Sequence, residues 1–154
     1  MTFKKKGVMM LATGANIGHL PVAPGTFGTL WGLPFILMML WVPESYKIIY
    51  CAGLILAAVW IADQAAALMD EKDPSCVIID EVAGFTIAMT TVPITFTTLL
   101  TGFLVFRIFD IVKPFPVNWF DSNLKGGAGI VLDDIVAGIY SALVLGILNS
   151  FNLF

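Results

Sequence analysis

Four long, nearly uncharged segments dominate this sequence and restrict the folds open to it. They span, in chain order, residues 27–42, 46–62, 82–106 and 130–148. Of the 154 residues, 58% are hydrophobic and 12% are charged, whereas soluble domains carry about 25% charged residues. Each segment is near the roughly 20 residues that a helix needs to cross a bilayer. We therefore predict one all-α domain over residues 1–154, a polytopic integral membrane bundle with four to five membrane-embedded helices.

The third segment is longer than one crossing requires. Pro93 lies near its middle, within a threonine-rich stretch over residues 90–98. Proline lacks a backbone donor and clashes with the preceding helical turn, so we predict a hairpin of short helices near residues 82–91 and 96–110. Both would need local thinning of the bilayer or partial embedding. The alternative is a single kinked span, which would place the acidic residues at its two ends on opposite membrane faces.

Three acidic clusters lie at the edges of these apolar segments: Asp80-Glu81, Asp110 and Asp133-Asp134. A carboxylate beside hydrocarbon is unfavourable unless a cation or another partner compensates its charge. The two pairs are expected at helix starts, where acidic residues are also common as simple caps. Two such pairs, with Asp110 at the end of a third helix, favour a divalent metal site. Oxygen ligands without histidine or cysteine indicate Mg²⁺, with Mn²⁺ as a substitute.

Basic residues accompany Asp110. Arg107, Asp110 and Lys113 recur at intervals of three, so they share one face of a helix end. Pro114 is expected to push Lys113 out of helical geometry. The two basic side chains could be dipole complements or membrane-interface anchors. Alternatively they bind phosphate, with Arg107 making paired hydrogen bonds and Lys113 acting as a point charge.

Glycine-containing turns precede the first and last apolar segments. They are Pro24-Gly25-Thr26 and Gly126-Gly127-Ala128-Gly129. Backbone N–H groups at a helix start can bind an anion, so Gly25 and Thr26 are candidate substrate-binding residues. Such turns are also common as plain joints between a loop and a helix. Thr26 is expected at least to be the N-cap.

The hairpin also determines the predicted orientation. With the N-terminus in the cytoplasm, all three acidic clusters lie on the cytoplasmic face. Only Lys47 among the basic residues then lies outside, in agreement with the positive-inside rule. The basic residues inside are Lys4, Lys5, Lys6, Lys72, Arg107, Lys113 and Lys125.

Four strings, in order and spacing over residues 14–142, resemble the phosphatidylglycerophosphatase A family. They are PVAPGT at 21–26, IDEVAG at 79–84, FRIFDIVKPFP at 106–116 and DDIVAG at 133–138. The resemblance implies an enzyme of the bacterial inner membrane that removes the terminal phosphate of phosphatidylglycerophosphate, with Mg²⁺, to give phosphatidylglycerol. The family's acidic and basic positions match here as Asp80, Glu81, Asp110, Asp133, Asp134, Arg107 and Lys113.

The chemistry expected from this resemblance leaves two routes open. The five carboxylates would hold one or two Mg²⁺, and a water activated by the cation is the expected nucleophile. The alternative is attack by a carboxylate to form a phospho-aspartate. Two other classes of function are a cation-coupled transporter or channel and a non-catalytic protein that binds anionic lipid through Lys4–Lys6 and Lys125. No nucleic-acid-binding pattern is present, and the sequence does not indicate an oligomeric state.

Overall fold

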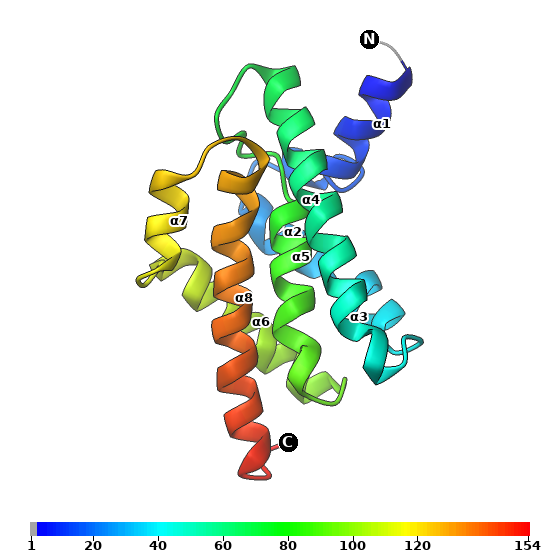
Figure 1. The fold of residues 1–154 in the computed structure, drawn as a ribbon, viewed down its shortest axis with the longest axis vertical. Helices are drawn as coiled ribbons and strands as arrows, with labels where there is room; N and C mark the ends of the chain where they lie inside the picture. Colours follow the sequence, from blue (N-terminus) through cyan, green and yellow to red (C-terminus); the bar gives the residue numbers. More distant parts are fainter. Residues whose placement is uncertain (1–2) are drawn as a thin grey trace.

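The computed structural model describes residues 3–154, which form helices joined by turns and short loops, with no strand among them. The helices are α1 (Phe3–Ala12), α2 (Pro24–Trp31), α3 (Leu33–Met39), α4 (Lys47–Met69), α5 (Ile79–Ala88), α6 (Phe96–Val112), α7 (Val117–Asn123) and α8 (Gly126–Ser150). Short 3₁₀ turns lie between some of them: η1 (Ile17–His19), η2 (Glu44–Tyr46) and η3 (Met89–Thr91). The predicted all-α class is confirmed (Figure 1).

Helix α8 is central, and α4, α5, α6 and α7 all pack on it. Its most extensive contact is with α5, which runs beside it in the same direction (Figure 1). The two helices touch at Gly84 and Gly138: a Cβ atom added to Gly138 would lie 2.3 Å from the carbonyl oxygen of Gly84. Small residues let helix backbones approach this closely. The two glycines therefore set the distance between α5 and α8.

The chain reverses at Pro93, between α5 and α6. Thr95 caps the start of α6, and Thr98 returns a hydrogen bond to the Thr95 backbone N–H. The Thr98 hydroxyl also donates to the carbonyl oxygen of Pro93 at 2.6 Å. The threonine-rich stretch thus supplies the polar groups that begin the second helix. The two predicted helices are confirmed, and one continuous kinked helix is not formed.

Residues 27–42 do not form the single helix expected from their apolar character. Helix α2 ends at Trp31 and α3 begins at Leu33, with Gly32 between them. Pro34 lies in the first turn of α3, where its missing N–H is tolerated. The same proline would break the hydrogen bonding of a continuous helix. With 8 and 7 residues, α2 and α3 are each too short to cross a bilayer.

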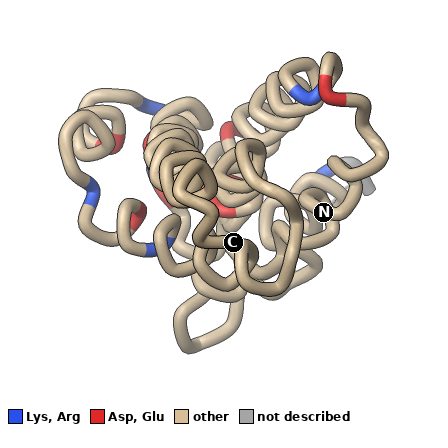
Figure 2. Tube along the Cα trace, turned by 90° about the horizontal axis from the view of Figure 1, so that it is seen from below, with Lys and Arg blue, Asp and Glu red and all other residues tan. Residues whose placement is uncertain are grey.

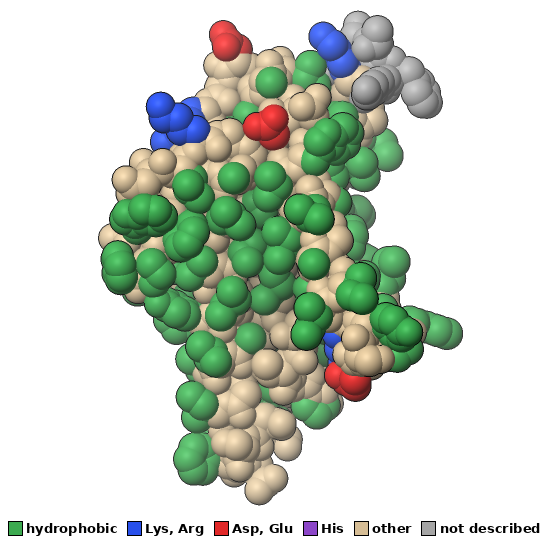
Figure 3. All heavy atoms as spheres, in the orientation of Figure 1, with side chains coloured by type: hydrophobic (Ala, Val, Ile, Leu, Met, Phe, Trp, Pro, Cys, Tyr) green, Lys and Arg blue, Asp and Glu red, His purple; other side chains and the backbone are tan. Residues whose placement is uncertain are grey.

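Within the described residues, two helices are long and apolar enough to cross a membrane: α8, and α4 together with η2. Seen along the bundle, several acidic positions lie between the central helices (Figure 2). Hydrophobic side chains cover the middle of the molecule, while charged side chains gather mainly at its upper end (Figure 3). This distribution agrees with a membrane protein, and the number of crossings stays a prediction.

Candidate active site

Three carboxylates from two helices meet near the α5–α8 contact. Asp80 and Glu81 lie in the first turn of α5, as predicted, and Asp134 lies one turn before Gly138 in α8. One oxygen from each of the three residues lies within 4.8 Å of the other two. The contact between Gly84 and Gly138 explains this meeting, because each glycine lies one turn after an acidic residue of the cluster. Oxygen ligands at such spacing can share one divalent cation.

The cluster has oxygen atoms without partners. Asp80 Oδ1 and Glu81 Oε2 are buried, and neither has a hydrogen-bond partner among the described residues. Buried carboxylate oxygens are unfavourable when unpaired, and neighbouring negative charges increase the penalty. A hard divalent cation would compensate both effects, so this donor set fits Mg²⁺.

Asp133 and Asp134 do not lie at a helix start, so that prediction is wrong. Helix α8 begins at Gly126, which places both residues about two turns inside it, each only 4% exposed. The helix starts early because Gly127 packs closely on α4 and its N–H donates to Asp63 Oδ1 at 3.0 Å. The glycine run is therefore a contact between helices. The favourable field of a helix N-terminus fades within the first turn, so it does not stabilise these buried acids.

Arg107 and Asp110 of α6 lie beside the cluster. The guanidinium of Arg107 donates to Asp110 Oδ2 at 2.5 Å. A Cβ atom at Gly25 would lie 2.6 Å from Glu81 Oε1 and 3.0 Å from Arg107 Nη1. Gly25 therefore lies at the site, and a side chain at this position would press on the ends of both charged side chains. Asp110 is near enough to Glu81 and Asp134 for its charge to act on both.

Thr26 occupies a different position from the one expected. The N-cap of α2 is Ala23, and Pro24 follows it in the first turn. Thr26 lies inside the helix and is half-buried. The N-cap prediction is wrong because the helix begins earlier than the apolar segment, at the proline that favours a first helical position. Substrate binding by Thr26 stays a prediction.

Lys113 bridges two other carboxylates. It ends α6 with a φ of 45°, outside right-handed helical geometry, as Pro114 predicted. Its ammonium donates to Asp121 Oδ1 and to Asp133 Oδ2, each at 2.8 Å. Burial alone would lower the pKa of Lys113, but the two carboxylates outweigh burial and hold that pKa above its ordinary value. Lys113 is thus a fixed positive charge against Asp133, whose Oδ1 is buried without a partner among the described residues.

Asp121 is a member of this group that the sequence analysis missed. It lies in α7, a short helix outside the four apolar segments. A signal was available, because Asp121 is the one acidic residue between Lys113 and Asp133 in the sequence. Its importance depends on α7 packing against α8, and the sequence pattern gave no indication of that contact.

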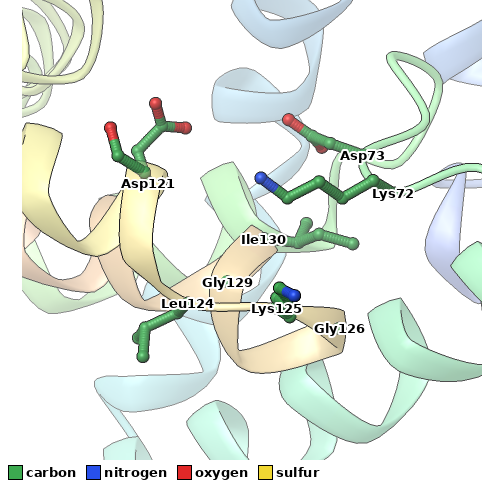
Figure 4. A pocket seen from close by; sticks show the side chains of 9 residues that line it. Lys72, Asp73, Asp121, Leu124, Lys125, Gly126, Gly129 and Ile130 are labelled. Atoms are coloured by element: carbon green, nitrogen blue, oxygen red, sulfur yellow. The ribbon is translucent and has the colours of Figure 1, made fainter.

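A polar cavity of about 250 Å³ adjoins this lysine bridge (Figure 4). Its walls come from the loop after α4, from α7 and from the start of α8, and Asp121 lines it. The side chain of Lys72 points into the cavity, on the side of Asp73 (Figure 4). Neither Lys72 nor Lys125 forms an ion pair with the described residues. The cavity therefore offers a hydrophilic approach to the group around Lys113.

Comparison with known proteins relates this chain to a family. A family profile described as Phosphatidylglycerophosphatase A matches residues 10–149. The phosphatidylglycerophosphatase A of Escherichia coli (strain K12) is 38% identical over 138 residues, which cover 88% of this chain and 80% of that protein. The Haemophilus influenzae protein of the same name is 35% identical, and the match covers 90% of this chain and 86% of that protein.

A third relative carries a different name. It is a Bacteroides thetaiotaomicron protein provisionally named phosphatidylinositol-3-phosphatase, 33% identical, with 90% of this chain and 91% of that protein covered. No solved structure matches this chain. The extent of the profile match and of the similarity to the two enzymes shows that the chain belongs to the phosphatidylglycerophosphatase A family.

Proposed function

We propose that this chain is a phosphoric monoester hydrolase that converts phosphatidylglycerophosphate into phosphatidylglycerol and phosphate. The observation that carries the proposal is the meeting of Asp80, Glu81 and Asp134, with the guanidinium of Arg107 beside them. A cation site next to a guanidinium suits phosphoryl transfer, because charge on the equatorial phosphate oxygens must be stabilised in the transition state. The names of the relatives supply the identity of the lipid.

Mg²⁺ is the cofactor we propose. Asp80, Glu81 and Asp134 would hold it, with Asp110 and Asp133 as further acidic groups at the site. The support is chemical: buried oxygens of Asp80 and Glu81 have no partner among the described residues. When bound, the cation would neutralise phosphate charge and lower the pKa of a water molecule.

The protein's own side chains would divide the remaining work. Arg107 can present two parallel N–H groups to phosphate oxygens, and its ion pair with Asp110 holds it beside the cluster before substrate arrives. Lys113 supplies a fixed positive charge. Asp133, through its unpartnered Oδ1, is our candidate for accepting the proton of an attacking water. Attack by a carboxylate through a phospho-aspartate stays the alternative.

We also propose a multi-pass position in the bacterial inner membrane, with the site facing the cytoplasm. The apolar helices α4 and α8 support membrane insertion. Most of the basic side chains visible in Figure 3 lie at one end of the molecule, and this asymmetry supports the orientation. In this arrangement the acyl chains of the substrate stay in hydrocarbon while the headgroup reaches the carboxylates.

The test is phosphate release by the purified protein from phosphatidylglycerophosphate in mixed micelles, with Mg²⁺ and with a chelator. Asp134→Asn keeps the side-chain size but removes a charge, so it should lose most activity while remaining folded. Asp70→Asn is the matched control, because Asp70 is exposed at the end of α4 and asparagine tolerates its left-handed conformation.

Each outcome separates one part of the proposal. Phosphatidylinositol 3-phosphate is the second substrate to test, because of the name of the Bacteroides relative. Full activity in the chelator would refute the metal requirement. The transporter hypothesis would instead be supported by two results together. The protein would release phosphate from neither lipid, and proteoliposomes would show an ion flux that depends on the acidic residues.

A further inference from the structure

An apolar groove of about 290 Å³ lies between α6 and the junction of α2 with α3. Leucine and phenylalanine side chains line it. Phe85 and Phe103 are part of this lining, and their rings pack edge to face with centroids 6.2 Å apart. The rim is open, because Leu30 is 42% exposed, Leu100 is 50% exposed and Phe96 is 81% exposed. The groove is therefore accessible to a ligand that approaches from outside the bundle.

The groove leads toward the charged site along two helices. Phe103 lies one turn before Arg107 on α6, and Phe85 lies one turn after Glu81 on α5. Residues spaced three to four apart lie on the same face of a helix. Phe96, Phe103 and Arg107 therefore form one stripe along α6. The guanidinium lies at one end of this stripe, and exposed hydrocarbon lies at the other.

We propose that this groove holds one acyl chain of the lipid phosphate and so fixes the position of the headgroup; this inference rests on the proposed function. The change from apolar to charged along the stripe matches the change along a phospholipid. The polar cavity near Lys113 shares no lining residue with the groove, so hydrocarbon and water would reach the site by separate routes.

The groove acts mainly by positioning. A chain that moves from the bilayer into the groove exchanges one hydrocarbon environment for another, so the hydrophobic effect contributes little affinity. A chain held along the stripe does restrict the depth and direction of the headgroup relative to Arg107. Displacement of a reacting group by about 1 Å can cost about 100-fold in rate. Occupation of the groove should therefore affect kcat/KM.

The experiment blocks the groove and compares two substrates. Leu100→Trp places a larger side chain in the groove. Leu104→Trp is the matched control, because Leu104 is on the same helix and 52% exposed but does not line the groove. The substrates are long-chain phosphatidylglycerophosphate and a water-soluble dibutyryl analogue with the same headgroup. Leu100→Trp should lower the long-chain to short-chain ratio of kcat/KM about tenfold or more, and Leu104→Trp should leave it unchanged.

The outcomes distinguish the groove from the activity itself. Equal ratios in the two variants, whether lowered or unchanged, would overturn the acyl-chain assignment. If the wild-type protein hydrolyses neither substrate, the proposed function fails, and a binding measurement decides the groove. A phosphatidylglycerophosphate with a diazirine in one acyl chain should then label residues 96–103, and Leu100→Trp should suppress that labelling. Equal labelling of α4 and α8, or occupation of the groove by a second copy of the chain, would overturn the proposal.

Discussion

One methyl group added at the α5–α8 contact should disable the carboxylate cluster from a distance. In Gly138→Ala the new Cβ atom would lie 2.3 Å from the Gly84 carbonyl oxygen, whereas ordinary contacts begin at 3.4 Å. The neighbouring atoms belong to backbone and cannot rotate away. The two helices must therefore separate or slide by about 1 Å to restore normal contact.

This displacement reaches the cluster because Asp80 and Asp134 each lie one turn before one of the two glycines. A misplacement of about 1 Å can cost about 100-fold in rate, and overpacking costs about 1–3 kcal/mol of stability. We expect kcat to fall about 100-fold, the Mg²⁺ concentration for half-maximal activity to rise, and the thermal unfolding midpoint to decrease.

The assay is phosphate release over a Mg²⁺ titration, with thermal unfolding measured in the same detergent. Gly146→Ala is the matched control on the same helix, because its Cβ atom would meet side-chain atoms of Thr91 at an ordinary 3.6 Å. Alanine is favoured over glycine in a helix by up to about 1 kcal/mol, so the control should be active and at least as stable. A Gly138→Ala protein with wild-type kcat and Mg²⁺ dependence would refute the argument.

Three further predictions concern charge and access. Arg107→Lys should lower kcat/KM about 10–100-fold, because a lost charged hydrogen bond costs about 1.5–3 kcal/mol. Lys113→Arg should lower kcat/KM less than Arg107→Lys does, measured in steady-state assays at saturating Mg²⁺. Equal decreases in kcat/KM for the two variants would contradict this. Asp121→Asn should lower kcat/KM at most about fivefold, since partly exposed ion pairs contribute about 1 kcal/mol or less; a hundredfold loss would mean that Asp121 acts on the substrate. Burial raises the pKa of the Cys76 thiol, so maleimide should label it far more slowly than the exposed thiol of Ser75→Cys; equal rates would contradict its burial.

The sequence allowed the prediction that acidic residues from distant segments lie together, because few helix arrangements compensate carboxylates at the edges of apolar segments. Asp80 and Asp134 border apolar segments, and a carboxylate there needs compensation that hydrocarbon cannot supply. Pro93 and its threonine neighbours interrupt the segment that follows Asp80. A reversal at that point is the simplest way to bring Asp110 back to the same end. The structure forms this reversal.

The start of α8 could not be inferred because a tertiary contact overrides local preference. Glycine is about 1 kcal/mol less favourable than alanine inside a helix, so the run from Gly126 to Gly129 indicated a loop. In the structure, close packing of Gly127 on α4 and its hydrogen bond to Asp63 hold this run in the helix. The sequence contains the two partners, but their separation along the chain hides the contact.

The surroundings of the basic residues were equally hidden. We predict that Arg107 and Lys113 bind phosphate, and in the structure each also forms ion pairs with carboxylates. Spacing along α6 could reveal the partner Asp110, because both residues lie on one helix face. It could not reveal Asp121, whose position depends on the packing of α7 against α8.

The charges of the site indicate the order in which a cation and the lipid headgroup bind. Among the described residues, two basic side chains, Arg107 and Lys113, form ion pairs with acidic residues of this site. The acidic residues here are Asp80, Glu81, Asp110, Asp121, Asp133 and Asp134. A phosphomonoester carries about 1.5 to 2 negative charges at neutral pH, so this surface would repel it in the absence of a metal. A divalent cation at the cluster would offset two of these negative charges and present a local positive charge to the phosphate. We therefore expect the cation to bind before the lipid headgroup.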